Sequence, residues 1–332
     1  MPKTLIVGDV HATPQEIPDC EALLKLIFDS IKNYKCDSVI FLGDQFNTHD
    51  ILNSRVVDFW TKAINDLSDL IRSYFLIGNH DQLTPTIRNP HSMVSFYSAP
   101  TDICDSPRGY PELNACCMPY YVNPLEFIEA ANKLKEANPT IDTLYCHQTF
   151  SGADEGKGFY SKESVEPTAI PFKRIISGHI HKPMQLGKVF YPGAPRWRNL
   201  TDAEVAVRNI FVWEQGKIPN AIPTNTHCVR IYRVEDSEEV PFKASFTAED
   251  LIRADIRVTI TGTQEYISKR ILELRSKYNA KCRGVPTRQK LIKTSESEGI
   301  DKAFSKFGSY FTPPNGSEKD LLLKEVSGRL GL

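Results

Sequence analysis

The sequence has no long apolar run. No stretch among its 332 residues approaches the ~18 apolar residues that a membrane-spanning helix needs. Its opening Met-Pro-Lys-Thr passes at once into a strand-like segment, which is not the pattern of a secretory signal. The eight cysteines lack the CxxC spacing of zinc and redox motifs, and a chain of this size does not depend on disulfides. We therefore expect reduced thiols, no membrane contact and a cytoplasmic location (the host cytoplasm if the source is viral).

The sequence also has almost no net charge, since 40 Lys and Arg face 41 Asp and Glu. This balance hides an asymmetry, because residues 251–332 hold 16 basic residues against 9 acidic ones. Between Lys269 and Lys293, nine basic residues accompany the single acid Glu273. A basic patch on an otherwise acidic protein is typical of a polyanion contact. A solvated helix face would give the same pattern, so the charge run leaves both interpretations open.

Short apolar runs alternate with helical patterns through the first ~200 residues, which predicts an α/β layered core. We expect the core helices to cover residues 20–33, 56–71 and 124–136. A strand over 256–261, a helix over 264–278 and a returning strand over 281–285 indicate a small α+β domain. The predicted domains are a core over 1–240, a capping domain over 249–293 and a tail over 294–332.

The tail carries two apolar stripes at helical spacing. The first consists of Ile300, Phe304, Phe307 and Phe311, and a Pro-Pro-Asn-Gly break separates it from a second that ends at Leu330. Such stripes pack either on the core of their own chain or on a partner protein. We therefore predict a helical tail and leave both packing partners open.

Five short segments place polar side chains where a strand-like apolar run ends. They are Gly8-Asp9-Val10-His11, Gly43-Asp44, Gly78-Asn79-His80-Asp81, the lone His147, and Gly178-His179-Ile180-His181. A parallel sheet brings the carboxyl ends of its strands to one edge. We therefore expect the five segments to converge in space, although about 170 residues separate the first from the last.

Two of these segments carry a pair of potential metal ligands two residues apart. In extended backbone the side chains at i and i+2 point the same way. Asp9 and His11 can therefore hold one ion together, and His179 and His181 repeat the arrangement.

The other segments complete a set of oxygen and nitrogen donors. Asp44 can bridge two ions, Asn79 offers an amide oxygen, and His147 adds an imidazole, although alone it would equally fit a packed core histidine. Such a set without thiolates suits Mn²⁺, Fe²⁺ or Zn²⁺ better than Ca²⁺ or a structural cysteine-bound zinc. We expect two divalent ions, with Mn²⁺ preferred over Mg²⁺, Fe²⁺ or Zn²⁺.

This donor set favours hydrolysis of phosphoesters. Two divalent cations carry more charge than Asp9 and Asp44 neutralise, so the centre attracts a phosphodiester monoanion. Two ions about 3.5–4 Å apart activate water and clamp the oxygens of an in-line displacement. His80 is the candidate for stabilising the reacting phosphorus or protonating the leaving oxygen, and Asp81 is the candidate for orienting or charging His80.

The order of motifs resembles that of the calcineurin-like metallophosphoesterase superfamily, whose pattern runs DxH, GDxx, GNHD, a lone His, and GHxH. The resemblance covers residues 1 to about 235. It implies an α/β fold in the form of a four-layer αββα sandwich. It also implies the role of each side chain: Asp9, His11 and His181 hold one ion, Asn79, His147 and His179 hold the other, Asp44 bridges them, and His80 is the catalytic acid.

Within that superfamily the chain is similar to the SbcD-type nuclease subunits of DNA double-strand-break repair complexes, and most to the short bacteriophage recombination endonuclease subunits. Gly43-Asp44-Gln45-Phe46 and the segment 191–195, Tyr-Pro-Gly-Ala-Pro, carry this narrower resemblance. It implies a Mn²⁺-dependent DNA exonuclease and endonuclease that works with an SbcC-like coiled-coil ATPase. The ATPase would bind the helical tail, and the subunit would form a homodimer within a heterotetramer.

The same resemblance implies a set of DNA contacts. In related nucleases from eukaryotic and archaeal cells, a histidine at the position of Asn47 contacts DNA phosphate and supports exonuclease activity. Asn47 can donate a hydrogen bond to phosphate but cannot become charged, and this puts the rate of exonuclease action in doubt. The other predicted contacts lie beside the last metal ligands and in the basic stretch; they are Lys182, Arg196, Arg198, Lys269, Arg270, Arg275 and Lys277.

Two other functions use the same residues. A stand-alone phosphatase or cyclic-nucleotide phosphodiesterase would need the same ligands, but the roughly 100 residues beyond the core exceed what a minimal enzyme of this type requires. A catalytically idle subunit that loads an ATPase onto DNA is the third hypothesis. The complete set of ligands and the presence of His80 count against it.

Overall fold

The computed structural model describes residues 2–84, 86–154, 164–205, 207–224, 227–243, 246, 251 and 253–287. The predicted helical tail and the last residues of the predicted capping domain lie outside this set. Over the described residues the chain forms two six-stranded sheets, a three-stranded sheet and a two-stranded hairpin, together with helices.

The first six-stranded sheet has the order β14-β13-β1-β2-β3-β6. Its strands are β1 (Lys3–Val7), β2 (Ser38–Phe41), β3 (Arg72–Leu76), β6 (Asp102–Cys104), β13 (Asn209–Glu214) and β14 (Asn220–Pro223). Strands β1, β2, β3 and β6 pair in parallel, and β13 runs antiparallel to β1. Their near-continuous apolar sequences suit central strands that are covered on both faces.

The second six-stranded sheet has the order β11-β12-β10-β9-β8-β7. Its strands are β7 (Arg108–Tyr110), β8 (Ala115–Met118), β9 (Thr143–His147), β10 (Arg174–Gly178), β11 (Met184–Leu186) and β12 (Val189–Tyr191). Strands β8, β9, β10 and β12 are parallel, and β7 and β11 close the two edges in antiparallel fashion.

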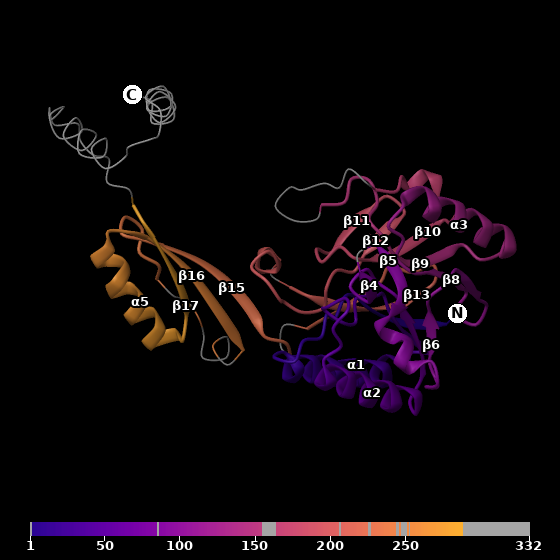
Figure 1. Ribbon diagram of the computed structural model, residues 1–332, viewed down its shortest axis with the longest axis horizontal. Coiled ribbons are helices and arrows are strands. Elements are labelled where there is room, and N and C mark those ends of the chain that lie inside the picture. Colours follow the sequence, from indigo (N-terminus) through magenta and orange to yellow (C-terminus); the bar gives the residue numbers. More distant parts are fainter. Residues whose placement is uncertain are drawn as a thin grey trace, which may run out of the picture. The chain divides into compact units, whose positions relative to one another are not determined.

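Three helices cover the outer faces of the two sheets (Figure 1). Helices α1 (Ile17–Tyr34) and α2 (Ser54–Ser68) pack on the first sheet, where Leu23 and Trp60 belong to one buried cluster with strand residues such as Leu5. Helix α3 (Pro124–Ala137) packs on the second sheet. A third cluster, which includes Ile6 and Ile176, fills the space between the sheets. The predicted four-layer αββα arrangement is therefore confirmed.

Short elements connect these layers. They are the hairpin strands β4 (Gln82–Thr84) and β5 (Ile87–His91) and the 3₁₀ helices η1 (Ser92–Phe96), η2 (Pro167–Ala169) and η3 (Asp202–Glu204). The asparagines Asn53 and Asn123 cap α2 and α3, because each side chain accepts a backbone N–H from two residues ahead.

The small sheet has the order β15-β16-β17 and carries one helix. Its elements are β15 (Arg230–Ser237), β16 (Ala254–Gly262), α5 (Gln264–Tyr278) and β17 (Lys281–Pro286), which match the predicted capping unit except that β15 begins earlier in the chain. Ile256, Val258, Ile267 and Leu274 are among the residues of its own buried cluster. The boundaries given above for the three domains stay predictions.

All eight cysteines are free thiols, as the sequence predicts, and six of them are buried. Among the described residues no helix is both long and apolar enough to cross a membrane.

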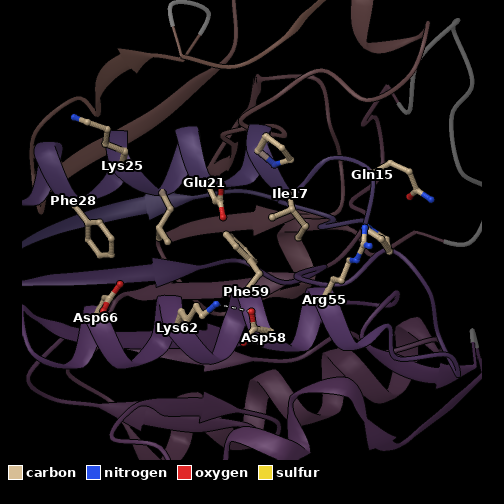
Figure 2. Close-up of a pocket in the computed structure, with 13 residues that line it drawn as sticks. Gln15, Ile17, Glu21, Lys25, Phe28, Arg55, Asp58, Phe59, Lys62 and Asp66 are labelled. Carbon is tan, nitrogen blue, oxygen red and sulfur yellow. Dashed lines mark hydrogen bonds and ion pairs between the residues drawn. The ribbon is translucent and has the colours of Figure 1, made fainter.

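A cavity of about 950 Å³ lies between α1 and α2 (Figure 2). Ile17 and Phe59 contribute apolar surface, while Glu21 and the ion pair of Lys62 with Asp58 lie among its charged residues. Its lining includes none of the residues that the sequence predicts to bind metal.

Candidate metal centre

The ends of β1, β2, β3, β9 and β10 bring the five motif segments together. Six of the predicted ligands and His80 form three overlapping groups whose candidate ligand atoms lie within 4.8 Å of one another. The groups are Asp9, His11 and His181; His11, Asp44 and His80; and Asp44, His147 and His179. The oxygen Oδ1 of Asn79 joins them, 2.7 Å from Nδ1 of His179 and 3.0 Å from Nε2 of His147. The predicted convergence is confirmed, and metal binding by these residues stays a prediction.

The backbone that presents these side chains is not simply extended. His11, Asp44 and His179 have φ angles of 47°, 54° and 79°, in the left-handed region that non-glycine residues rarely adopt. Asp9 and His11 nevertheless share one group, as predicted, and Val10 between them lies in a buried cluster. His179 and His181 fall in different groups, although Ile180 between them is likewise buried. Non-glycine residues held in such conformations are concentrated at functional sites, where the surrounding fold supports the strain.

Glycines in the motifs allow the strand ends to approach one another. A Cβ atom on Gly178 would lie 2.6 Å from Oδ1 of Asp9 and 2.7 Å from Nδ1 of His147. A Cβ atom on Gly43, which has a φ of 110°, would lie 2.4 Å from the same His147 nitrogen. Both distances are shorter than any real Cβ contact, so a side chain at either position would push the ligands apart.

The carboxylate of Asp9 fits a cationic centre because it is buried and accepts no hydrogen bond among the described residues. Its nearest cationic neighbours are imidazole nitrogens, Nδ1 of His147 at 3.8 Å and Nε2 of His181 at 3.9 Å. An uncompensated buried charge costs several kcal/mol, roughly 3–5 when a partner is removed. Carboxylate and imidazole donors without thiolate are ligands that divalent transition metals accept. The residues present therefore fit a pair of divalent ions.

The two carboxylates respond differently to burial. Burial raises the pKa of Asp9 to about 6, against the opposing effect of His147. Asp44 is equally buried, but His147 and His11 outweigh that burial and hold its pKa well below the ordinary value. Asp44 lies between the groups, with Oδ2 3.3 Å from Nε2 of His11 and 3.5 Å from Nε2 of His147. This central position agrees with the predicted bridging role.

His147 is fully buried and lies in one group with Asp44 and His179. Its Nδ1 hydrogen-bonds the backbone oxygen of Leu42 at 2.8 Å, which assigns the ring proton to Nδ1 and leaves the lone pair of Nε2 toward Asn79 and Asp44. Burial alone disfavours the charged ring, but Asp44 raises the pKa of His147 to about 9. The second proton of the charged ring lies on Nε2, and a metal ion held at Nε2 would take its place.

A carboxylate that the sequence did not single out supports His181. Oδ1 of Asp202 lies 3.5 Å from Nδ1 of His181 and 2.9 Å from the guanidinium of Arg208. Although burial acts the other way, His181 and Arg208 lower the pKa of Asp202 to about 2. Carboxylates of this kind orient metal-binding histidines. Asp202 lies in η3, 21 residues beyond His181, and no motif in the sequence marks it.

His80 lies at the rim of the centre. Its backbone N–H donates to Oδ1 of Asp44 at 2.8 Å, and its Nδ1 hydrogen-bonds the backbone oxygen of Asn47 at 3.0 Å. Its ring packs edge-on against His11, with centroids 4.7 Å apart, and stacks on His49 at 5.0 Å. Burial lowers the pKa of His80, with Asp44 acting in the opposite direction.

Asp81 does not orient His80, contrary to the expectation from the sequence, because the Asn47 carbonyl occupies that position. Asp81 is fully buried, and its carboxylate accepts backbone N–H groups from Phe46 and Gly78, each at 3.0 Å. Burial raises its pKa to about 7. These contacts join the loops after β2 and β3, so Asp81 supports the centre from behind.

Of the basic residues near the centre that are predicted to contact DNA, one is buried and two are partly exposed. Arg196 is wholly buried and donates to the backbone oxygens of Val10 and His11 and to Glu16 and Asp19, so the prediction that it contacts DNA is wrong. The guanidinium of Arg198 bonds the side chain of Asn47, and Lys182 pairs with Asp154 at 2.6 Å. Both of these residues are partly exposed.

The basic residues of α5 that are predicted to contact DNA also differ in exposure. Arg270 is mostly buried and pairs with Asp236 and Glu273, each at 2.7 Å, so it holds the small sheet together and the prediction that it contacts DNA is also wrong. Lys269, Arg275 and Lys277 are exposed, and among the described residues none of the three forms an ion pair.

Sequence comparison assigns the family. Residues 2–183, more than half of the chain, match the calcineurin-like phosphoesterase family. The chain belongs to this family. Family members are hydrolases of phosphoesters that use divalent metal ions, in agreement with the donor set of the centre. The broader resemblance drawn from the motifs is therefore confirmed, whereas membership of the SbcD-type group is not shown.

Two viral proteins are similar to this member of the calcineurin-like family. "Putative phosphoesterase 244L" of Invertebrate iridescent virus 6 is 27% identical over 200 residues, which cover 58% of this chain and 69% of the relative. "Putative phosphoesterase 078R" of Invertebrate iridescent virus 3 is 26% identical over 200 residues, covering 57% of this chain and 56% of the relative.

Among solved structures, the chain is similar to "GAP50 the anchor in the inner membrane complex of Plasmodium". The similarity has a TM-score of 0.39 and 12% sequence identity, and it covers 67% of this chain and 88% of the other.

Proposed function

We propose that this protein is a two-metal-dependent DNA nuclease, with exonuclease and endonuclease activity, and that it serves as the nuclease subunit of an SbcCD-like recombination and repair complex. The observation that carries the proposal is the cluster of Asp9, Asp44, Asn79 and four histidines, with His80 at its rim. Divalent ions, when bound there, supply the Lewis acidity that activates water and holds the phosphate.

The residues of the chain prepare this reaction. Leu42 and Asp202 fix the rings of His147 and His181, so the donor atoms are oriented before substrate arrives. The Asn47 carbonyl holds Nδ1 of His80, which leaves Nε2 as the atom for proton transfer to the leaving oxygen. The motif glycines keep the strand ends close, and Asp9, His11, Asp44 and His147 are buried.

The exposed cations of α5 support a polyanionic substrate. Lys269, Arg275 and Lys277 lie on the helix of the small sheet, and none is neutralised by an acid among the described residues. Cations in such positions contribute salt-dependent contacts to phosphates, independent of base sequence. Asn47, Arg198 and Lys182 lie nearer the centre and are proposed to contact the strand that is cut.

We include the assembly in the proposal. The chain would form a homodimer and bind an SbcC-like coiled-coil ATPase through residues 294–332, which lie outside the described part of the chain. A stand-alone phosphatase or cyclic-nucleotide phosphodiesterase is the second candidate, because it would use the same donors and the same His80.

The deciding experiment is digestion of duplex and hairpin DNA, labelled at the 5′ or 3′ end, in Mn²⁺, with and without a co-expressed ATPase. 4-Nitrophenyl phosphate and adenosine 3′,5′-cyclic phosphate serve as competing substrates. The nuclease proposal predicts cleavage of DNA in preference to both. Turnover of either small substrate without DNA cleavage would favour the second candidate.

A variant of His80 separates catalysis from metal binding. His80→Ala is expected to lower DNA cleavage by roughly 10²–10⁴-fold, the usual contribution of general acid catalysis, while Mn²⁺ still raises the melting temperature. His227→Ala, at a histidine outside the centre, is the matched control and should retain full activity. Unchanged cleavage by His80→Ala would contradict the catalytic role of His80, and absence of cleavage by the wild type as well would favour the idle-subunit hypothesis.

A second set of variants tests the DNA contact. Replacing Lys269, Arg275 and Lys277 together by Ala should weaken DNA binding and reduce the slope of log affinity against log salt by up to about 0.9 per lost phosphate contact. The triple variant Lys25→Ala, Lys62→Ala, Lys133→Ala removes the same charge from the core helices and is the control. Equal slopes for the two variants would contradict a role for α5.

A further inference from the structure

A second cavity, of about 520 Å³, adjoins the metal centre and has no role in the function proposed above. It opens between the β4–β5 hairpin and the start of α3. Its lining residues are Gln82, Thr86, Asn89, Tyr120, Val122, Asn123 and Glu126. Volumes of roughly 300–1,000 Å³ are typical of sites for small ligands.

Tyr120 connects this cavity to the centre. Its ring stacks on that of His179, with centroids 5.5 Å apart and an interplanar angle of 26°, and it packs edge-on against His147 at 6.1 Å. Its backbone N–H donates to the carbonyl of Ile77 at 2.9 Å, which fixes this segment beside the end of β3. A group inside the cavity would therefore lie next to a phosphate held at the centre.

Gln82 holds the segment that carries Tyr120 in place. Its side chain is 1% exposed, and its Nε2 donates to the backbone oxygen of Tyr120 at 3.1 Å. Because this hydrogen bond is buried, Gln82 belongs to the wall of the cavity and fixes the backbone from which the Tyr120 ring extends.

The charges in the lining exclude a second phosphate. No Lys or Arg is among the lining residues, and Glu126 is the one charged side chain of the lining. What remains is an aromatic ring, amide side chains and a carboxylate. Aromatic rings stack on nucleobases, and amide and carboxylate oxygens accept hydrogen bonds from their N–H edges.

We propose that this cavity binds the nucleobase adjacent to the reacting phosphate, with the ring of Tyr120 as the stacking residue and Gln82 as the residue that positions it. The inference rests on the proposed nuclease function and deepens it, because the enzyme would then bind the nucleoside as well as the phosphate. Stacking is tolerant of base identity, so the site is expected to accept any of the four bases.

Binding tests the inference without any turnover. Deoxycytidine 5′-phosphate and 2-deoxyribose 5-phosphate, which differ only in the base, are titrated into the full chain with Mn²⁺ by calorimetry. The nucleotide should bind at least about fivefold more tightly, as expected for one stacked base. Equal affinity, including no detectable binding of either ligand, would overturn the inference.

Variants of Tyr120 assign the difference to the cavity. Tyr120→Phe keeps the ring and should keep the preference for the nucleotide, whereas Tyr120→Leu should reduce it to less than twofold. A preference that survives in Tyr120→Leu would place the base elsewhere. Tyr120 also touches His179, so its replacement can weaken phosphate binding. Both ligands carry the phosphate, so we compare the ratio of the nucleotide affinity to the sugar phosphate affinity, from which such a loss cancels.

Hydrolysis separates this inference from the proposed function. The 4-nitrophenyl esters of thymidine 5′-phosphate and thymidine 3′-phosphate are compared with 4-nitrophenyl phenyl phosphate, which has the same leaving group and no base. At least one thymidine ester should have the higher kcat/KM. Failure to hydrolyse any of the three contradicts the proposed function, whereas equal hydrolysis of all three contradicts only the base site.

Discussion

Nδ1 of His147 and the backbone oxygen of Leu42 are joined by a 2.8 Å hydrogen bond that ties the second sheet to the first at the metal centre. His147 ends β9 in one sheet, and Leu42 follows β2 in the other. The bond fixes the ring so that Nε2 is 3.0 Å from Asn79 Oδ1. The two sheets therefore build the centre jointly, and its donors depend on how the sheets are packed.

Replacing Asp9 by Asn should weaken metal binding and raise the melting temperature of the metal-free protein. Burial disfavours the carboxylate charge and raises the pKa of Asp9 to about 6, and the variant removes this charge, so the metal-free protein should melt a few degrees higher. The increase in melting temperature that Mn²⁺ gives to the wild type should largely disappear. Thermal unfolding with EDTA and with Mn²⁺ measures both effects, and a metal-free variant that melts lower than the wild type would contradict this account of Asp9.

Gly178→Ala should disrupt the centre through steric overlap. The new methyl group would meet Asp9, Leu42 and His147 at 2.6–2.7 Å, so we expect the free energy of unfolding to fall by about 1–3 kcal/mol or more, together with Mn²⁺ affinity. Gly187→Ala is the control, because nothing lies within 4 Å of its new methyl group and only the strain of its φ of 57° remains, about 1–2 kcal/mol. If Gly187→Ala lost as much metal affinity, crowding would not be the cause.

Asp81→Ala should lower the free energy of unfolding, whereas His80→Ala should lower the rate of catalysis. Removing the Asp81 carboxylate leaves the buried N–H groups of Phe46 and Gly78 without acceptors, at about 1–3 kcal/mol each. Urea denaturation should therefore show a loss of roughly 2–5 kcal/mol for Asp81→Ala and a much smaller one for His80→Ala. A stable Asp81→Ala protein with a selective loss of kcat would instead restore the catalytic role first predicted for it.

The ion pair of Asp236 and Arg270 should make the small sheet sensitive to acid. Burial alone would raise the pKa of Asp236, but Arg270 and the Phe242 N–H lower it below the ordinary value of 3.8. A carboxyl whose pKa is lower in the folded state stabilises the protein above the unfolded pKa, and that contribution is lost as pH falls through the folded value.

The difference in stability between the wild type and Asp236→Asn should therefore be largest near neutral pH and should shrink below about pH 4. Denaturation at several pH values, followed through hydrogen exchange of α5 amides, measures it. Glu235→Gln, on the exposed side of β15, is the control and should show little change at any pH. A difference that stayed constant down to pH 3 would contradict the role of the ionised pair.

The sequence was sufficient to predict the layers and the members of the centre. Each core strand is a short apolar run that ends in a polar motif, and this local pattern survives folding. The helix predicted over 264–278 matches α5, because a capping Thr263 and a left-handed Asn279 mark its ends. Parallel strands then require Asp9 and His179 to lie at the same edge, whatever their separation in sequence.

The features that could not be predicted from the sequence arise from contacts between segments that are distant in the chain. Arg196 has the appearance of a free cation beside the last ligands, but the backbone oxygens of Val10 and His11 bury it. Asp202 and Tyr120 carry no motif, and only the fold brings them against His181 and His179. The strands β6 and β7 are three residues each, which is too short to show a periodic pattern in the sequence.

The close contact between Gly178 and its neighbours has a consequence for how such an enzyme can diversify. With no room for even one extra carbon atom, the innermost positions cannot vary without loss of the centre. New substrate preferences must then arise from positions at the periphery, such as Thr86 and Val122, whose side chains are exposed and tolerate change.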